Sequence, residues 1–186
     1  RMTIRGDKAQ TLDEQMRDVL QFLPGVFDQK IRKIVMNKSY RNTMEIARYA
    51  EKLTGVKDVE LLKRHGKEVV EEQFQTEDAV LDEILSKAKL GEDEYETAAI
   101  ITMTEAEAST LYQILKARGE EVHYIDRNSS VFKKGLTVTT FYLAKGLEFD
   151  QVFGVFQDAG NPMLNQAKYI CATRALHELY MYQITE

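Results

Sequence analysis

The chain has 186 residues, of which 44% are hydrophobic and 30% charged, as is ordinary for a soluble globular protein with one full core. Its net charge of −5 argues against a protein that grips nucleic acid by bulk electrostatics, because phosphate binding needs clustered Lys and Arg. No run of about 20 apolar residues occurs, so the composition also excludes an ordinary membrane-spanning helix.

Strand-type and helix-type patterns alternate along the chain. Apolar and β-branched runs predict strands at 31–36, 97–102, 122–125, 136–141, 152–156 and 179–184, after a short strand within 1–10. Apolar residues at helical spacing predict helices at 12–20, 42–55, 76–88, 104–119 and 164–175. Periodicity alone leaves a buried helix open for the most apolar runs. The alternation predicts an α/β layered fold with a mainly parallel sheet flanked by helices.

Capping and turn residues mark the boundaries of these elements. Asn42 with Glu45 predicts a capping box at one helix start. The segment 59–74 predicts a β-hairpin that turns at His65-Gly66. Further predicted boundaries are Thr76 and Thr104 (with Glu107) at helix starts and Gly55 and Gly119 at helix ends.

The sequence contains no self-sufficient nucleotide or metal motif. Neither G-x-x-x-x-G-K-[ST] nor G-x-G-x-x-G occurs, and one cysteine with three separated histidines does not make a zinc site, so we predict no metal site. Cys171 with His177 could form a thiol nucleophile, but a lone cysteine on an apolar helical face is more often core. Because a single cysteine cannot form an internal disulfide, we predict a protein of the reducing cytoplasm.

Charged and polar side chains follow several predicted elements. They are Gln10, Arg41, Lys145, Glu148 and Arg174. Ligands of open α/β sheets bind outside the carboxyl ends of strands, so we expect Arg41 and Glu148 to lie there. The loop around Gly146 is either such a site or a plain polar connection. Arg174 lies near a helix end, where the helix dipole also favours a cation.

Four stretches, in this order, resemble the motor motifs III to VI of UvrD/Rep-type superfamily 1 DNA helicases. Residues 2–10 (MTIRGDKAQ) resemble motif III, 38–43 (KSYRNT) motif IV, 140–149 motif V through its AKGLEF core, and 169–175 (YICATRA) with 178–180 motif VI. The chain is most similar to the HelD or helicase IV-like branch of this family. The resemblance covers nearly the whole chain.

The resemblance implies a RecA-like P-loop NTPase-type fold that lacks its own P-loop. Residues 1–25 would be the end of the first RecA-like domain and a linker, and residues 26–186 the second RecA-like helicase domain. ATP with Mg²⁺ would bind in the cleft between the two domains. The Walker lysine and the Mg²⁺ ligands belong to the first domain, so we expect this chain by itself to hydrolyse no ATP. The connector 126–134 leaves no counterpart of the subdomain often inserted before motif V, which favours translocation over duplex unwinding.

The resemblance also implies roles for individual residues. Tyr40 would stack on adenine, and Glu148 would bond the ribose. Arg41 and Arg174 would reach the γ-phosphate, and Gln10 would sense that phosphate from the first domain. Gly146 would lie at the nucleotide. Arg41, Arg174 and Gln10 would be the catalytic residues, because groups supplied across a cleft stabilise charge on the transferring phosphoryl group. Thr140 and Tyr142, in motif V, would contact the nucleic acid; Tyr142 occupies a position that is often His.

Three functions remain open on the sequence. The first is the C-terminal motor domain of an ATP-dependent DNA helicase or translocase, with the first RecA-like domain and single-stranded DNA as partners. The second uses the same motor to displace RNA polymerase or another protein from nucleic acid, and the polymer that stimulates ATP turnover would separate the two. The third is a catalytically dead α/β interaction module, for which loss of Arg174 would leave turnover unchanged.

Overall fold

The computed structural model describes residues 41–55, 63–91, 94–129 and 133–185, together with the backbone of 38–39 and 60–61. The elements predicted within 1–10, at 12–20 and at 31–36 lie outside the described residues. So does the domain division predicted at residue 25.

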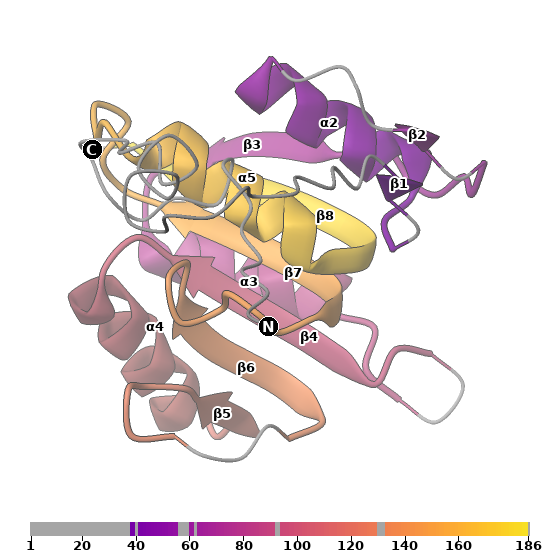
Figure 1. Cartoon of the computed structure of the whole chain (residues 1–186). Coiled ribbons are helices and arrows are strands. Elements are labelled where there is room, and N and C mark those ends of the chain that lie inside the picture. Colours follow the sequence, from indigo (N-terminus) through magenta and orange to yellow (C-terminus); the bar gives the residue numbers. More distant parts are fainter. Residues whose placement is uncertain are drawn as a thin grey trace, which may run out of the picture.

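A six-stranded sheet forms the centre of the molecule (Figure 1). Its strands, in spatial order, are β3 (Val70–Phe74), β8 (Ala175–Ile184), β7 (Phe149–Phe156), β4 (Thr97–Thr102), β6 (Gly135–Thr140) and β5 (Val122–Tyr124). Every pairing in this order is parallel, which confirms the predicted parallel sheet. A separate parallel pair joins β1 (Lys38–Ser39) to β2 (Glu60–Leu61).

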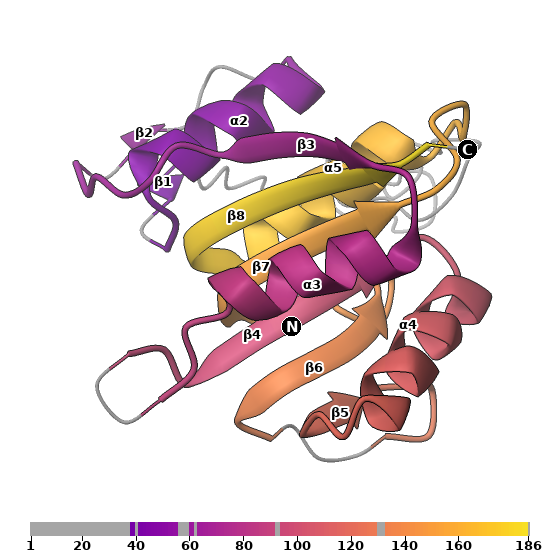
Figure 2. The same ribbon diagram turned by 180° about the vertical axis from the view of Figure 1, so that it is seen from behind.

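Helices cover both faces of the sheet, as Figures 1 and 2 show from opposite sides. One face carries α2 (Met44–Thr54) and α5 (Leu164–Arg174), and the other carries α3 (Glu77–Lys87) and α4 (Glu105–Ala117). The α/β layered fold is therefore confirmed. Among the described helices, none is both long enough and apolar enough to cross a membrane.

Burial on both faces explains why the strand runs are almost wholly apolar. All of β4 is buried, and so is most of β7. Phe153 of β7 is 0% exposed, and its ring stacks on that of Tyr180 in β8 with centroids 4.9 Å apart. Cys171 lies in the core on the α5 face, as predicted, and burial raises the pKa of its thiol, which disfavours a reactive thiolate.

The helix boundaries follow local capping rules, with one correction. Thr104 and Glu107 form the predicted capping box of α4. The N-cap of α2 is Thr43, whose Oγ1 accepts from Ile46 N at 3.4 Å; the prediction of Asn42 was wrong. The side chain of Asn42 is engaged by another helix, so the neighbouring threonine caps α2. Predicted boundaries that are confirmed are Thr76 at the start of α3, Gly55 at the end of α2 and Gly119, which follows the C-cap residue of α4.

The predicted hairpin at 59–74 was also wrong. β3 pairs in parallel with β8, and β2 pairs in parallel with β1. The His65-Gly66 dipeptide instead contacts the start of α2, where Gly66 N donates to Glu45 Oε2 at 2.8 Å. A Cβ on Gly66 would lie 2.5 Å from Thr43 Cγ2, so the glycine permits this close approach.

The segment 141–148 joins two strands that lie on opposite sides of β4. Because β6 and β7 are parallel, the segment must run from the carboxyl end of the sheet to its amino end. Phe141 and Ala144 anchor it in the core on the same face as α5, while Lys145, Gly146 and Glu148 are exposed. Gly146 turns it with a φ of 95°, which confirms the predicted turn. The segment therefore connects the two ends of the sheet.

Candidate functional site

Arg41 and Glu148 meet at the amino end of β7. Arg41 Nη1 donates to Glu148 Oε1 at 2.6 Å, and the two side chains are 55% and 38% exposed. Glu148 directly precedes β7. Because an exposed ion pair contributes only about 0–1 kcal/mol to stability, a ligand could separate these groups at small cost.

Arg174 lies beside this pair. It is the last residue of α5, where a cation is favoured by the helix dipole, and its next neighbour begins β8. The guanidinium is buried and donates from Nη1 to Leu147 O at 3.0 Å and from Nε to Thr173 Oγ1 at 3.3 Å. Since Leu147 directly precedes Glu148, Arg174 is fixed next to the Arg41–Glu148 pair.

Asn42 forms a further connection between these stretches. Its Nδ2 donates to Ala172 O at 2.9 Å and to Ala175 O at 2.7 Å, on either side of Arg174. Figure 1 shows the start of α2 and the junction of α5 with β8 at the same end of the sheet. Sequence reasoning missed this contact because Asn42 also fits the pattern of a helix N-cap.

The location of the site differs from the expected one. We expected Arg41 and Glu148 at the carboxyl ends of strands, but the site lies at the amino ends of β7 and β8. Glu148 follows β6 in sequence, yet the 141–148 segment carries it across the sheet before β7 begins. Gly146 lies in the same segment. Gln10 and Tyr40 lie outside the described residues, and the nucleotide roles of all these residues stay predictions.

Tyr142 lies near the opposite, carboxyl end of the sheet. Its hydroxyl donates to Glu105 Oε1 at 2.7 Å, and Arg127 Nε donates to the same oxygen at 2.9 Å. The Arg127 guanidinium is 5.8 Å from the centre of the Tyr142 ring. The hydrogen bonds from Tyr142 and Arg127 lower the pKa of Glu105, which keeps this carboxylate charged.

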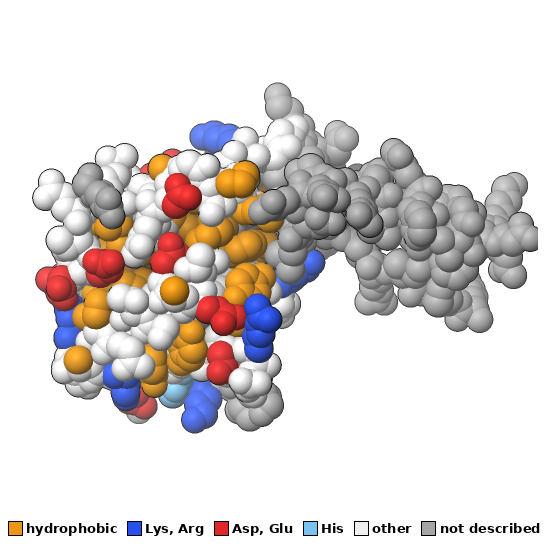
Figure 3. Space-filling model, turned by 90° about the vertical axis from the view of Figure 1, so that its left-hand side faces the viewer, with side chains coloured by type: hydrophobic (Ala, Val, Ile, Leu, Met, Phe, Trp, Pro, Cys, Tyr) orange, Lys and Arg blue, Asp and Glu red, His pale blue; other side chains and the backbone are white. Residues whose placement is uncertain are grey.

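Thr140 lies deeper than Tyr142. It is 1% exposed, and within the described part of the chain its Oγ1 has no hydrogen-bond partner. Figure 3 looks onto the carboxyl end of the sheet, where hydrophobic side chains are exposed between acidic and basic ones. A half-buried tyrosine at such a surface suits stacking on a nucleobase. Nucleic-acid contact by Thr140 and Tyr142 stays a prediction.

A buried carboxylate, that of Glu178, forms several polar contacts near the amino end of β8. Glu178 is 3% exposed and accepts from Tyr180 Oη at 2.6 Å and Gln151 Nε2 at 2.9 Å, while Lys67 Nζ lies 2.8 Å from its Oε1. Burial raises the pKa of Glu178, but the hydrogen bonds from Lys67, Tyr180 and Gln151 outweigh burial and lower it to about 2. Residues 178–180 belong to the motif VI resemblance, but the contacts of Glu178 with Lys67 and Gln151 could not be predicted, because these residues come from distant parts of the chain.

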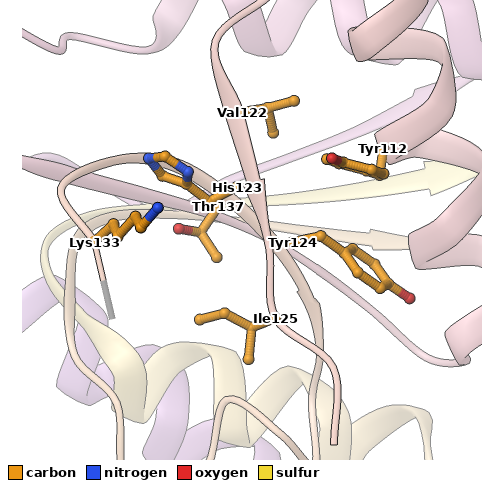
Figure 4. Close-up of a pocket in the computed structure, with 7 residues that line it drawn as sticks. All are labelled: Tyr112, Val122, His123, Tyr124, Ile125, Lys133 and Thr137. Atoms are coloured by element: carbon orange, nitrogen blue, oxygen red, sulfur yellow. The ribbon is translucent and has the colours of Figure 1, made fainter. Parts of the chain in front are cut away.

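A hollow lies along the edge strand β5, away from the residues described above at the two ends of the sheet. Figure 4 shows His123, Lys133 and Thr137 to one side of β5, with Tyr112 and Tyr124 to the other. Its volume of about 240 Å³ is below the ~300–1,000 Å³ typical of ligand pockets, and no carboxylate lines it. Across the described residues, no three His, Cys, Asp or Glu side chains lie together in a way that could hold a metal ion.

Comparisons with known proteins agree with the helicase resemblance at the level of the domain. The solved structure of the C-terminal domain of a possible DNA helicase from Lactobacillus plantarum WCFS1 is 28% identical, with a TM-score of 0.57 over 78% of this chain and 88% of that one. The predicted RecA-like helicase-domain fold is thus confirmed. The UvrD/Rep and HelD-like assignment stays a prediction.

Two further structures are too distant to support a conclusion about this chain. Two structures of arterivirus nonstructural protein 10 (helicase), one of them in complex with DNA, are 13% and 14% identical, with TM-scores of 0.41 and 0.42. The aligned regions cover 62% and 63% of this chain and 27% and 28% of those proteins. No family model and no curated protein matches the chain. The chain is therefore similar, in fold and at 28% sequence identity, to the C-terminal domain of a possible DNA helicase.

Proposed function

We propose that this chain is the C-terminal motor domain of an ATP-dependent DNA helicase or translocase. In this proposal the Arg41–Glu148–Arg174 edge binds a nucleotide presented by a P-loop domain. The observation that carries the proposal is the convergence of three stretches, far apart in sequence, on one end of the sheet. The similarity to the C-terminal domain of a possible DNA helicase supports the same conclusion.

The side chains at this edge fit a nucleoside triphosphate. A guanidinium presents planar forked donors that match phosphate oxygens, and the exposed Arg41 can exchange the Glu148 carboxylate for a phosphate. Glu148 is then free to accept from a ribose hydroxyl. Arg174, fixed by Leu147 O, adds positive charge where the transferred group becomes more negative. When bound, Mg²⁺ neutralises charge between the β- and γ-phosphates, and its ligands would come from the P-loop domain.

The opposite end of the sheet would contact the nucleic acid. Tyr142 presents a ring there, and the 141–148 segment, which Phe141 and Ala144 anchor in the core, joins it to Glu148. When the nucleotide edge (Arg41, Glu148 and Arg174) closes against the P-loop domain, the nucleic-acid contact at Tyr142 would therefore move as well. This connection is the physical basis for coupling hydrolysis to movement.

The polymer that stimulates ATP turnover tests the proposal. The assay uses the protein with its P-loop domain present and compares no polymer, single-stranded DNA, single-stranded RNA and RNA polymerase. We expect single-stranded DNA to stimulate turnover most strongly. Stimulation by RNA polymerase alone would replace the proposal with the remodeller that displaces this enzyme from nucleic acid. An equal rate of ATP turnover in all four conditions would contradict both motor functions.

Tyr142→Ala is expected to weaken binding of single-stranded DNA about tenfold, because stacking contributes about 1–3 kcal/mol per base. Tyr142→Phe keeps the ring and loses only the hydroxyl bond to Glu105, so we expect its affinity to stay within about threefold of the wild type. Fluorescence anisotropy with a labelled oligothymidylate measures both. Tyr112→Ala, on α4, is the matched control and should not change binding. Equal affinity of the wild type and Tyr142→Ala would exclude Tyr142 from the nucleic-acid contact.

A further inference from the structure

We propose that Asn42 is a positioning residue that links Arg41 to Arg174 by capping the C-terminus of α5. The inference rests on the proposed function, because it concerns the same nucleotide edge. Asn42 directly follows Arg41, and its amide donates to Ala172 O at 2.9 Å and Ala175 O at 2.7 Å. These two carbonyls flank Arg174.

The end of α5 needs such donors. The last carbonyls of a helix have no intrahelical partner, and a left-handed glycine often satisfies them. Here the C-cap residue is Ala175 in an extended conformation (φ −82°, ψ 126°), and the chain turns directly into β8. The backbone N–H of Ala175 already bonds Cys171 O. The amide of Asn42 has two N–H donors and supplies what the helix end lacks.

The contacts around Asn42 close a ring that contains both arginines. Arg41 bonds Glu148, and Arg174 bonds the carbonyl of the preceding Leu147. Asn42 completes the circuit from Arg41 back to the end of α5. When a phosphate displaces Glu148 from Arg41, the bonds from Asn42 to the end of α5 remain, so the two arginines would still meet that phosphate at a set spacing. Catalysis depends on such placement, since an error of about 1 Å can lower a rate about a hundredfold.

The start of α2 is anchored independently of this ring. Met44 N donates to Arg64 O at 2.8 Å, and Glu45 accepts from Gly66 N at 2.8 Å. α2 should therefore stay in place when the amide of Asn42 is removed. The effect of its removal should be confined to the spacing between Arg41 and the end of α5.

Asn42→Ala and Asn42→Asp test the inference in the protein with its P-loop domain. The aspartate keeps the shape of asparagine but loses both donors and places a carboxylate against two carbonyl oxygens. We expect the DNA-stimulated kcat to fall about ten- to a hundredfold in both variants, with a smaller change in the KM for ATP. If either variant fails to fold, Asn42→Ser replaces it. Serine keeps one donor, and we again expect kcat to fall.

The other end of α5 offers a matched control. Asn161 Oδ1 accepts from Met163 N at 2.9 Å at the start of the helix. Asn161→Ala should destabilise the same helix and leave kcat within about twofold of the wild type, since it lies at the end remote from Arg174. An equal fall in kcat for Asn161→Ala and Asn42→Ala would assign Asn42 a merely structural role and overturn the inference.

A double-mutant cycle with Arg174→Ala separates this inference from the proposed function. If Asn42 acts through Arg174, adding Asn42→Ala to Arg174→Ala should lower kcat no further. A full additional loss would overturn the inference. So would an unchanged kcat in Asn42→Ala while Arg174→Ala is inactive, and that result would leave the proposed function intact. An unchanged kcat in Arg174→Ala itself would overturn the proposed function and this inference with it.

Discussion

Arg174→Ala is expected to lower DNA-stimulated ATP turnover about a thousandfold or more, the range found for arginines that stabilise phosphoryl transfer. The physical reason is charge: the guanidinium would act on the equatorial oxygens of the γ-phosphate as negative charge accumulates there. Single-turnover hydrolysis by the protein with its P-loop domain measures the effect. Arg174→Lys should recover little of the rate, because an ammonium lacks the planar fork that also holds Leu147 O.

The matched control is Arg118→Ala. Arg118 joins α4 to α3 through ion pairs with Asp78 and Asp82 and lies on the face of the sheet opposite α5. Its loss should cost some stability and leave turnover unchanged. Normal turnover in Arg174→Ala would point instead to an α/β interaction module without catalytic function.

Glu178→Gln is expected to lower the free energy of unfolding by on the order of 3 kcal/mol at pH 7. Glu178 is buried, yet the hydrogen bonds from Lys67, Tyr180 and Gln151 lower its pKa from 4.5 to about 2. A carboxylate whose pKa is lower in the folded state stabilises the fold fully above the unfolded pKa. This contribution is lost as the pH falls from about 4.5 to about 2.

Urea unfolding at several pH values measures this effect. The stability difference between the wild type and Glu178→Gln should be largest at neutral pH and should vanish as the pH approaches 2. Glu72→Gln, which changes an exposed carboxylate on the neighbouring strand β3, should show a much smaller difference. A difference that stays constant between pH 7 and pH 2.5 would show that the charge of Glu178 does not stabilise the fold.

Much of the fold could be predicted because its signals are local. The apolar runs at 97–102 and 152–156 are long enough to read as doubly covered strands, and Thr104 with Glu107 marks a helix start without any tertiary information. The hairpin at 59–74 could not be excluded locally. β3 pairs with β8 at the far end of the chain, and the Gly66 turn signal arises from close packing against Thr43.

For the candidate site, the sequence predicted that Arg41, Glu148 and Arg174 lie close together but not at which end of the sheet, and their roles at a nucleotide stay predictions. The resemblance pointed to Arg41, Glu148 and Arg174, and the structure brings them together. Whether they lie at the amino or the carboxyl end of the sheet depends on how the 141–148 segment crosses it, and no sequence pattern predicts this crossing. Likewise, Asn42 and Thr43 are both good capping residues, and only the position of α5 decides which of them caps α2.

The crossing segment 141–148 has a consequence for how this domain can vary. Its length must match the height of the strand that it passes, about 20 Å for a strand such as β4. A residue inserted into it would bulge or would shift Glu148 relative to Arg174, whereas surface connections such as 126–129 tolerate added residues easily. We therefore expect evolutionary change in length to accumulate in the outer connections and to spare this crossing segment.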